Sequence, residues 1–124
     1  MDNLTSRRIL LVEDHHDTAR AMARLLNLSG YDVHTAACCS DALLLCDEVQ
    51  FDLVISDVGL PDGTGYDLMR RMLDRQCATK GIAVSGYGSE QDVEDSLKAG
   101  FSLHLVKPVA FDDLRDAIKR TMAE

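Results

Sequence analysis

Hydrophobic residues along this chain gather into five short runs, separated by stretches in which they recur at helical spacing. The runs at 9–12 and 53–55 are uniformly apolar, which is typical of strands buried on both faces of a sheet. The run at 33–36 alternates in polarity and suits an edge strand, while 82–84 and 103–106 supply the fourth and fifth strands. Five strand–helix repeats predict an α/β fold with a parallel sheet, right-handed crossovers and helices on both faces.

Polar and glycine residues mark where the predicted helices begin and end. Asp17 is a candidate N-cap for the first helix, and Gly30 stands where a glycine would end it. Ser89 and Asp92 have the spacing of a capping box, and Gly100 ends that helix. The apolar stripes of four predicted helices are Ala19, Met22, Ala23 and Leu26; Ala42, Leu45, Cys46 and Val49; Leu68, Met72 and Leu73; and Phe111, Leu114, Ile118 and Met122. Residues 59–65 are dense in turn formers and are predicted to be a loop.

Length and charge narrow the class of protein. The 124 residues predict one domain over 1–124, and a hydrophobic fraction of 46% is enough for a core. No apolar run approaches a membrane span and no leader-like stretch follows Met1, so we expect a soluble, cytoplasmic domain. The net charge of −8 argues against nucleic-acid binding by this segment and suits a bound cation or a basic partner.

The four cysteines form no C-x-x-C motif and no zinc-like spacing with histidine. Cys39 and Cys46 are seven residues apart and share a helix face, which predicts small core hydrophobes rather than redox or metal chemistry. The neighbours Cys38 and Cys39 can oxidise in vitro, but nothing in the sequence marks that pair as functional.

Residues that can carry chemistry follow four of the five predicted strands. These residues are Glu13 and Asp14, then Asp57, Ser85 and Lys107. In an open parallel sheet the carboxyl ends of the strands form one ligand-binding edge, so we expect these side chains to meet there. Three carboxylates together need a cation, and an all-oxygen site suits Mg²⁺. A carboxylate can then attack a phosphoryl group whose charge the metal, a lysine and a hydroxyl neutralise.

Four segments together resemble the signature of response-regulator receiver domains, the CheY-like family. They are Ile-Leu-Leu-Val-Glu13-Asp14, Ser56-Asp57-Val-Gly-Leu-Pro61, Val84-Ser85-Gly86 and Val106-Lys107-Pro108. The resemblance covers essentially the whole chain. It implies a doubly wound, five-stranded parallel sheet of order 2-1-3-4-5 with five helices, as in flavodoxin-like folds.

The resemblance also implies roles for individual residues. Asp57 would accept a phosphoryl group from a phosphohistidine. Glu13, Asp14, Asp57 and the backbone carbonyl of Gly59 would hold Mg²⁺, with Mn²⁺ as a substitute. The implied partners are a histidine kinase, a histidine phosphotransfer domain, or both.

Further implied roles concern the phosphoryl group and the switch. Lys107, Ser85 and Gly86 would bind the phosphoryl oxygens, and the Lys107–Pro108 bond would be cis. Ser85 would move towards the modified aspartate. His104 stands where the family has tyrosine or phenylalanine, so either it transmits the switch with Ser85 or it is a strand histidine without a special role.

Weaker signals surround this site. Gly59 and Tyr87 occupy positions that in this family influence phosphoryl lifetime. His15 and His16 follow the acidic pair, and we interpret them as rim residues because adjacent residues rarely chelate one ion.

Two other functions compete with a phosphoacceptor switch. A haloacid-dehalogenase-like phosphatase would need a second aspartate two residues after Asp57, where this chain has Gly59. A pseudo-receiver would have lost phosphorylation, which the intact residue set disfavours. The segments 80–88 and 99–109 resemble receivers of hybrid histidine kinases, so we favour that origin over a stand-alone regulator. The full-length protein would then be a histidine kinase, whereas its oligomeric state is open.

Overall fold

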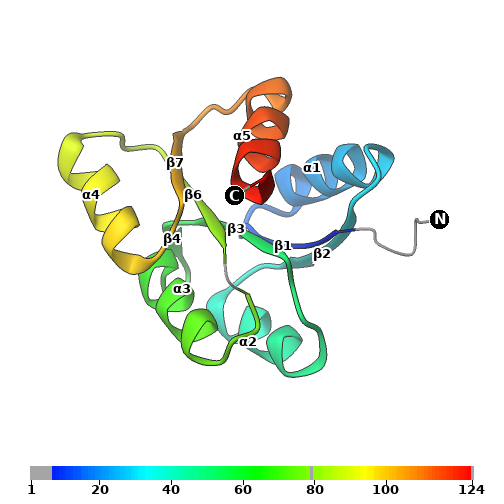
Figure 1. The fold of residues 1–124 in the computed structure, drawn as a ribbon, viewed down its shortest axis with the longest axis horizontal. Coiled ribbons are helices and arrows are strands. Elements are labelled where there is room, and N and C mark those ends of the chain that lie inside the picture. Colours follow the sequence, from blue (N-terminus) through cyan, green and yellow to red (C-terminus); the bar gives the residue numbers. More distant parts are fainter. Residues whose placement is uncertain (1–6, 79, 124) are drawn as a thin grey trace.

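Five parallel strands form one sheet between two layers of helices (Figure 1). The computed structural model describes residues 7–78 and 80–123. The strands of the sheet are β1 (Arg8–Val12), β2 (Asp32–Ala36), β3 (Leu53–Asp57), β6 (Gly81–Ser85) and β7 (Leu103–Val106). Their order, β2-β1-β3-β6-β7, confirms the predicted 2-1-3-4-5 arrangement, with β2 at one edge and the wholly buried β3 at the centre.

Helices cover both faces of the sheet, as the strand–helix alternation predicts. They are α1 (His16–Leu28), α2 (Cys39–Glu48), α3 (Gly65–Asp74), α4 (Glu90–Ala99) and α5 (Phe111–Ala123). Helices α1 and α5 pack on one face, while α2, α3 and α4 pack on the other, and each face has its own apolar core (Figure 1). Within 7–78 and 80–123, no helix is long and apolar enough to cross a membrane.

Most predicted helix ends are confirmed. Ser89 and Asp92 form a capping box at the start of α4, and each side chain accepts a backbone N–H of the other residue. Gly100 ends α4 with φ +109°, and Gly30 follows α1 with φ +101°. Both glycines adopt a left-handed conformation that residues with a Cβ rarely adopt.

The predicted cap of the first helix is wrong. Helix α1 begins at His16, its N-cap residue is His15, and that residue makes no side-chain cap bond. Asp17 therefore lies inside the first turn, where its charge still favours the positive end of the helix dipole.

Part of the predicted loop after β3 forms a small antiparallel hairpin of β4 (Gly59–Leu60) and β5 (Gly63–Thr64). The carboxylate of Asp62 in its turn accepts the backbone N–H groups of Cys39 at 2.8 Å and Ser40 at 3.0 Å. Helix α2 has no side-chain bond from its own N-cap residue, so Asp62 caps it across 23 and 22 positions of sequence. The hairpin that follows Asp57 is thereby attached to α2.

The prediction that Cys39 and Cys46 are core hydrophobes rather than redox residues is only partly confirmed, because Cys46 is disulfide-bonded. Cys46 and Cys77 are joined by a disulfide across 31 positions of sequence, while Cys38 and Cys39 are free. Cys39 and Cys46 do pack against the apolar core, as predicted. Helical periodicity shows which face of α2 holds a cysteine, but it contains no information about a partner on another element.

Candidate functional site

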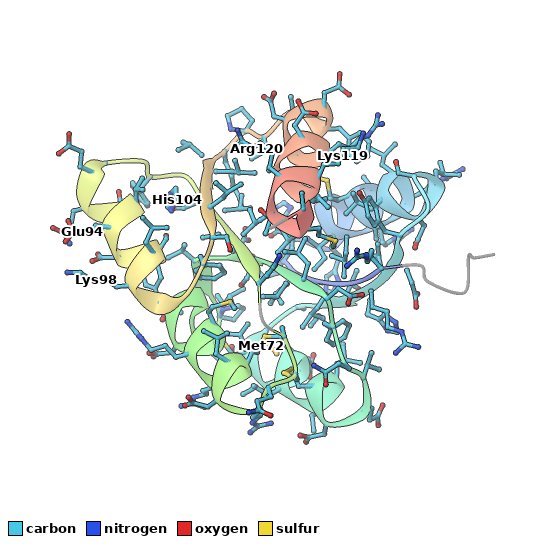
Figure 2. All side chains as sticks on the ribbon, viewed as in Figure 1. Met72, Glu94, Lys98, His104, Lys119 and Arg120 are labelled. Carbon is cyan, nitrogen blue, oxygen red and sulfur yellow. A yellow bond between two sulfur atoms is a disulfide. The ribbon has the colours of Figure 1, made fainter. Side chains whose placement is uncertain are left out.

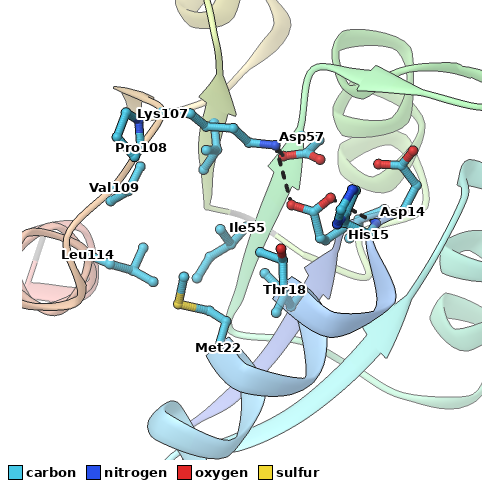
Figure 3. Close-up of a pocket in the computed structure, with 14 residues that line it drawn as sticks. Asp14, His15, Thr18, Met22, Ile55, Asp57, Lys107, Pro108, Val109 and Leu114 are labelled. Atoms are coloured by element: carbon cyan, nitrogen blue, oxygen red, sulfur yellow. Dashed lines mark hydrogen bonds and ion pairs between the residues drawn. The ribbon is translucent and has the colours of Figure 1, made fainter.

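Strand register brings the predicted chemical residues to one edge of the sheet. Val12 of β1 pairs with Ser56, Asp57 pairs with Val84, and Ser85 pairs with Val106. The residues that follow β1 and β7 therefore lie beside the ends of β3 and β6. This confirms that Glu13, Asp14, Asp57, Ser85 and Lys107 share the carboxyl edge; Figure 3 shows how closely Asp14, Asp57 and Lys107 approach.

Three carboxylates and one ammonium group form the charged centre of this edge. Carboxylate oxygens of Glu13, Asp14 and Asp57 lie within 4.8 Å of one another. The Lys107 Nζ is 2.9 Å from Asp57 Oδ1 and 3.4 Å from Glu13 Oε1 (Figure 3). Glu13 and Asp57 are buried, whereas Asp14 is exposed at the mouth. One lysine leaves two negative charges uncompensated when all three carboxyls ionise.

Burial of this excess negative charge perturbs the Asp57 carboxyl. Its pKa is raised to about 7, first by burial and then by the interaction with Glu13, while Lys107 acts to lower it. Burial also acts to raise the pKa of Glu13. That effect is outweighed by hydrogen bonds from Asp57, the His15 N–H and Lys107, so the pKa of Glu13 is lowered. Of the two carboxyls, Asp57 is therefore the one that takes up a proton more readily.

A divalent cation fits this donor set. All three side chains offer oxygen, two are buried and one faces solvent, which matches the incomplete protein ligation that Mg²⁺ prefers. A cation would replace a proton on Asp57 and offset the burial and the Glu13 interaction that raise the pKa of Asp57. Gly59 opens the hairpin two residues after Asp57, and its carbonyl as a ligand stays a prediction.

A cavity of about 620 Å³ opens beside Asp57. Asp14, Asp57 and Lys107 line its charged side, and its apolar wall includes Met22 of α1 and Leu114 of α5 (Figure 3). An apolar recess between α1 and α5 therefore adjoins the carboxylate that the sequence singles out.

The residues at the ends of β6 and β7 are joined to each other. The Lys107 N–H donates to the Ser85 carbonyl at 2.7 Å, and the Lys107–Pro108 bond is cis, as the resemblance implies. The Ser85 hydroxyl accepts the Tyr87 N–H at 3.0 Å. In the described part of the chain no hydrogen bond joins Ser85 to Asp57, so this hydroxyl is engaged within its own loop. Gly86 is the next, exposed residue of that loop.

His104 connects this loop to α4 (Figure 2). Its Nε2 lies 2.8 Å from the Tyr87 carbonyl, which can only accept, so Nε2 carries the hydrogen. In the neutral ring Nδ1 then accepts the Ser96 hydroxyl at 2.6 Å. We call the four connected residues Ser85, Tyr87, His104 and Ser96 the polar relay.

Ser96 is a member of the relay that sequence reasoning missed. It is completely buried on α4, and its hydroxyl pairs with the histidine of β7. A serine three residues after Val93, on the inward side of a short helix, was the available signal. The side chain of Tyr87 is 76% exposed, and the relay uses only its backbone.

Two residues next to Asp57 were also missed. A Cβ on Gly65 would collide with the backbone carbonyl of Asp57, so glycine allows α3 to begin against that residue. The Ser56 hydroxyl is buried and donates to the same carbonyl at 2.9 Å. The signal for Gly65 in the sequence was a glycine that opens a helix without forming a turn.

The two histidines after the acidic pair lie at the rim. Both are exposed; the His15 N–H donates to Glu13 Oε2 at 3.0 Å, and His15 lines the cavity. Its backbone, not its ring, therefore orients the Glu13 carboxylate.

Comparisons with known proteins agree with this geometry. Residues 9–119 match the model of the response regulator receiver domain. The chain is 27% identical to sporulation initiation phosphotransferase F of Bacillus subtilis, with 94% of each chain covered. It is 35% identical to hybrid signal transduction histidine kinase D of Dictyostelium discoideum, covering 90% of this chain but only 8% of the kinase.

A solved structure supports the same grouping. The CheY-like receiver domain protein of Methanospirillum hungatei superposes with a TM-score of 0.89 at 31% identity, over 96% of this chain and 95% of that one. A match that spans the sheet, both helical layers and the acidic edge shows more than a shared fold. The chain belongs to the response regulator receiver domain family.

Proposed function

We propose that Asp57 accepts a phosphoryl group from a phosphohistidine and that the resulting acyl phosphate switches the domain. One observation carries the proposal: Asp57 is buried between a lysine 2.9 Å away and two further carboxylates at the mouth of a cavity. The domain acts as a phosphoacceptor switch whose phosphoryl chemistry is directed only at itself.

The residues of the edge divide the chemistry between them. An ionised Asp57 oxygen attacks phosphorus, the phosphorus–nitrogen bond breaks, and the imidazole of the donor leaves. Lys107 turns from the carboxylate to a phosphoryl oxygen, and Ser85 with the Gly86 N–H bonds to other phosphoryl oxygens. Mg²⁺, or Mn²⁺ in its place, supplies positive charge when held by Glu13, Asp14, Asp57 and the Gly59 carbonyl.

The donor histidine belongs to a histidine kinase or a histidine phosphotransfer domain. The cavity supports this, because an apolar side chain beside the donor histidine can enter between Met22 and Leu114 while the histidine faces Asp57. Donor and acceptor would then be aligned without other contacts to the buried carboxylate.

Two settings fit the domain. We favour the receiver of a hybrid histidine kinase, and the stand-alone regulator is the alternative. The matched proteins include both, since the chain spans 94% of the Bacillus relative and 8% of the Dictyostelium kinase. A single domain over residues 1–124, a cytoplasmic location and an effect of Gly59 and Tyr87 on phosphoryl lifetime stay predictions.

The polar relay transmits the switch in this proposal. When the Ser85 hydroxyl turns to the phosphoryl group, the Tyr87 N–H loses its acceptor at 3.0 Å. The loop then moves, and the bond from His104 to the Tyr87 carbonyl breaks while Ser96 still holds the imidazole. Helix α4 thereby receives the change through one buried hydroxyl.

Acetyl phosphate with Mg²⁺ tests acceptance directly. Intact-mass spectrometry should show one added phosphoryl group in the native protein and in Asp113→Asn, which changes an exposed carboxylate of α5. Asp57→Asn should show none. Retained labelling in Asp57→Asn would reject the assignment.

NMR tests transmission separately. His104→Ala should accept the phosphoryl group normally but lose the phosphorylation-induced chemical-shift changes of α4. The exposed His16→Ala is the matched control and should keep them. If His104→Ala keeps the native phosphorylation-induced shift changes of α4, the relay is not part of the mechanism.

A further inference from the structure

The disulfide between Cys46 and Cys77 lies at the edge of the sheet opposite Asp57. Cys77 precedes β6, and its carbonyl accepts the Phe51 N–H at 2.8 Å just before β3 begins. Cys46 lies in the last turns of α2. The bridge therefore lies near the amino-terminal ends of the strands, whereas the proposed phosphoryl chemistry takes place at their carboxyl ends.

Hydrogen bonds between residues 50–51 and 76–77 hold together the segments that carry the two cysteines, independently of the bond between the sulfurs. The Cα atoms are 5.5 Å apart, within the range that an unstrained backbone offers a disulfide. Beside the Phe51–Cys77 bond, Gln50 Nε2 donates to the Gln76 carbonyl at 2.6 Å. The reduced thiols thus stay adjacent, and closing the bridge requires no movement of α2 relative to the α3–β6 turn.

The two cysteines differ in exposure. Cys77 is 4% exposed, while Cys46 is half-buried and packs against the apolar core with one side. A small oxidant in solvent would meet Cys46 first, and Cys77 would resolve the intermediate from inside. This division is the arrangement that intramolecular thiol–disulfide exchange needs.

The two free cysteines lack this arrangement. Burial and the nearby Asp62 raise the pKa of Cys39 to about 11, which keeps its thiol protonated and unreactive. Cys38 contacts the Ser40 hydroxyl at 3.4 Å and has a sequence neighbour, not a packed partner, as its nearest cysteine. Cys38 and Cys39 therefore serve as internal controls for the thiol chemistry of Cys46 and Cys77.

We propose that Cys46 and Cys77 are a redox-active pair that closes by exchange with a low-molecular-weight disulfide such as oxidised glutathione. The Cys46 thiolate attacks one glutathione sulfur, forming a mixed disulfide and releasing one reduced glutathione. The Cys77 thiolate attacks the Cys46 sulfur, forming the protein disulfide and releasing the second. Two protein thiols are oxidised, one glutathione disulfide is reduced, and both protons leave on the glutathione thiols.

The consequence is a covalent loop of the chain from 46 to 77, which contains β3, the Asp57 hairpin and α3. Closing a loop of this length removes conformations from the unfolded chain and stabilises the folded one. Because the bridge lies at the opposite edge from Lys107 and Glu13, phosphoryl uptake should be the same in both redox states. Oxidation would change the stability of the folded domain, but not the reaction of Asp57.

Peptide mapping tests the pairing. The protein is reduced, incubated with oxidised glutathione, alkylated under denaturing conditions and cleaved with trypsin and Asp-N. The expected product is peptide 41–46 joined to peptide 76–80, because cleavage before Asp41 and Asp47 and after Arg75 and Lys80 isolates each cysteine. Alkylation of both cysteines, or a bridge confined to 32–40, would overturn the proposal.

Thermal unfolding tests the consequence. The oxidised protein should melt at least about 5 °C above the reduced protein. Cys46→Ser should melt alike in both conditions, and a Cys38→Ser/Cys39→Ser double variant should keep the difference. Equal melting temperatures of the mapped oxidised and reduced native proteins would overturn it. Acetyl phosphate labelling in parallel separates this result from the phosphoacceptor proposal, since either can fail alone.

Discussion

The charged edge around Asp57 and the polar relay beside it are built on different principles. The edge is made by residues at the ends of parallel strands, so backbone register brings them together. The relay depends on the His104 side chain of β7, which bonds the Ser96 hydroxyl of α4 and the Tyr87 carbonyl of the loop after β6. An arrangement that the backbone imposes should be retained when neighbouring side chains are substituted. An arrangement made by hydrogen-bonded side chains is lost when either partner is substituted. Acceptance and transmission of the phosphoryl group should therefore be separable.

The largest expected effect is on the rate of phosphoryl uptake, from a substitution in the charged edge alone. Lys107→Ala removes the cation 2.9 Å from Asp57 and should slow phosphoryl uptake by roughly 100-fold, because transition-state charge loses a donor. Rates follow from intact mass against time with acetyl phosphate and Mg²⁺. Lys119→Ala, an exposed lysine of α5, should react at the native rate. A native rate in Lys107→Ala would mean that the edge does not act as a unit.

The next effect concerns stability without metal. The pKa of Asp57 is raised from 3.8 to about 7, so the folded state favours its protonated form and stability falls as pH rises through this window. The shift corresponds to at most about 4 kcal/mol, which solvent screening through the adjoining cavity reduces to about 1–2 kcal/mol. Asp57→Asn should therefore raise the free energy of unfolding by that amount near pH 8.

Mg²⁺ provides the control for that measurement. It should stabilise the native protein and not Asp57→Asn, since the cation replaces the proton only where the carboxylate remains. Urea unfolding followed by circular dichroism, with and without Mg²⁺, gives both values. A native protein that is more stable than Asp57→Asn without metal would show that the carboxylates are not repelling each other.

Metal affinity should follow the same titration. A cation competes with one proton whose pKa is about 7, so affinity should tighten about tenfold between about pH 6 and pH 8 and then level off. Calorimetric titration with Mg²⁺ at several pH values measures this. Affinity that is flat across the range would mean that the cation displaces no proton from Asp57.

The smallest effect isolates the relay. Ser96→Ala removes the hydroxyl 2.6 Å from His104 Nδ1 and should cost about 1 kcal/mol of stability. Phosphoryl uptake should stay within about twofold of native, while the α4 response seen by NMR weakens. Ser102→Ala, a partly buried serine in the turn before β7, should change neither. Slower uptake in Ser96→Ala would contradict the separation of the two regions.

The same contrast explains what could be predicted from the sequence. The parallel sheet and the gathering of Asp57 and Lys107 follow from apolar runs and from the residue after each run, which the backbone carries to one edge, whereas the strand order follows from the resemblance to receiver domains. The partner of His104, the cap supplied by Asp62 and the cysteine bonded to Cys46 depend on packing between different elements. Local periodicity shows on which face of its helix or strand a residue lies, but not which residue of another element it contacts.

The central claim is that Asp57 is the residue that becomes phosphorylated, and locating the phosphoryl group tests it most directly. The protein is labelled with acetyl phosphate and Mg²⁺, and borohydride then reduces the acyl phosphate to an alcohol before peptide mass spectrometry. We predict homoserine at position 57 and unchanged carboxylates at Glu13 and Asp14. Reduction at either of those residues, or at none of the three, would contradict the account.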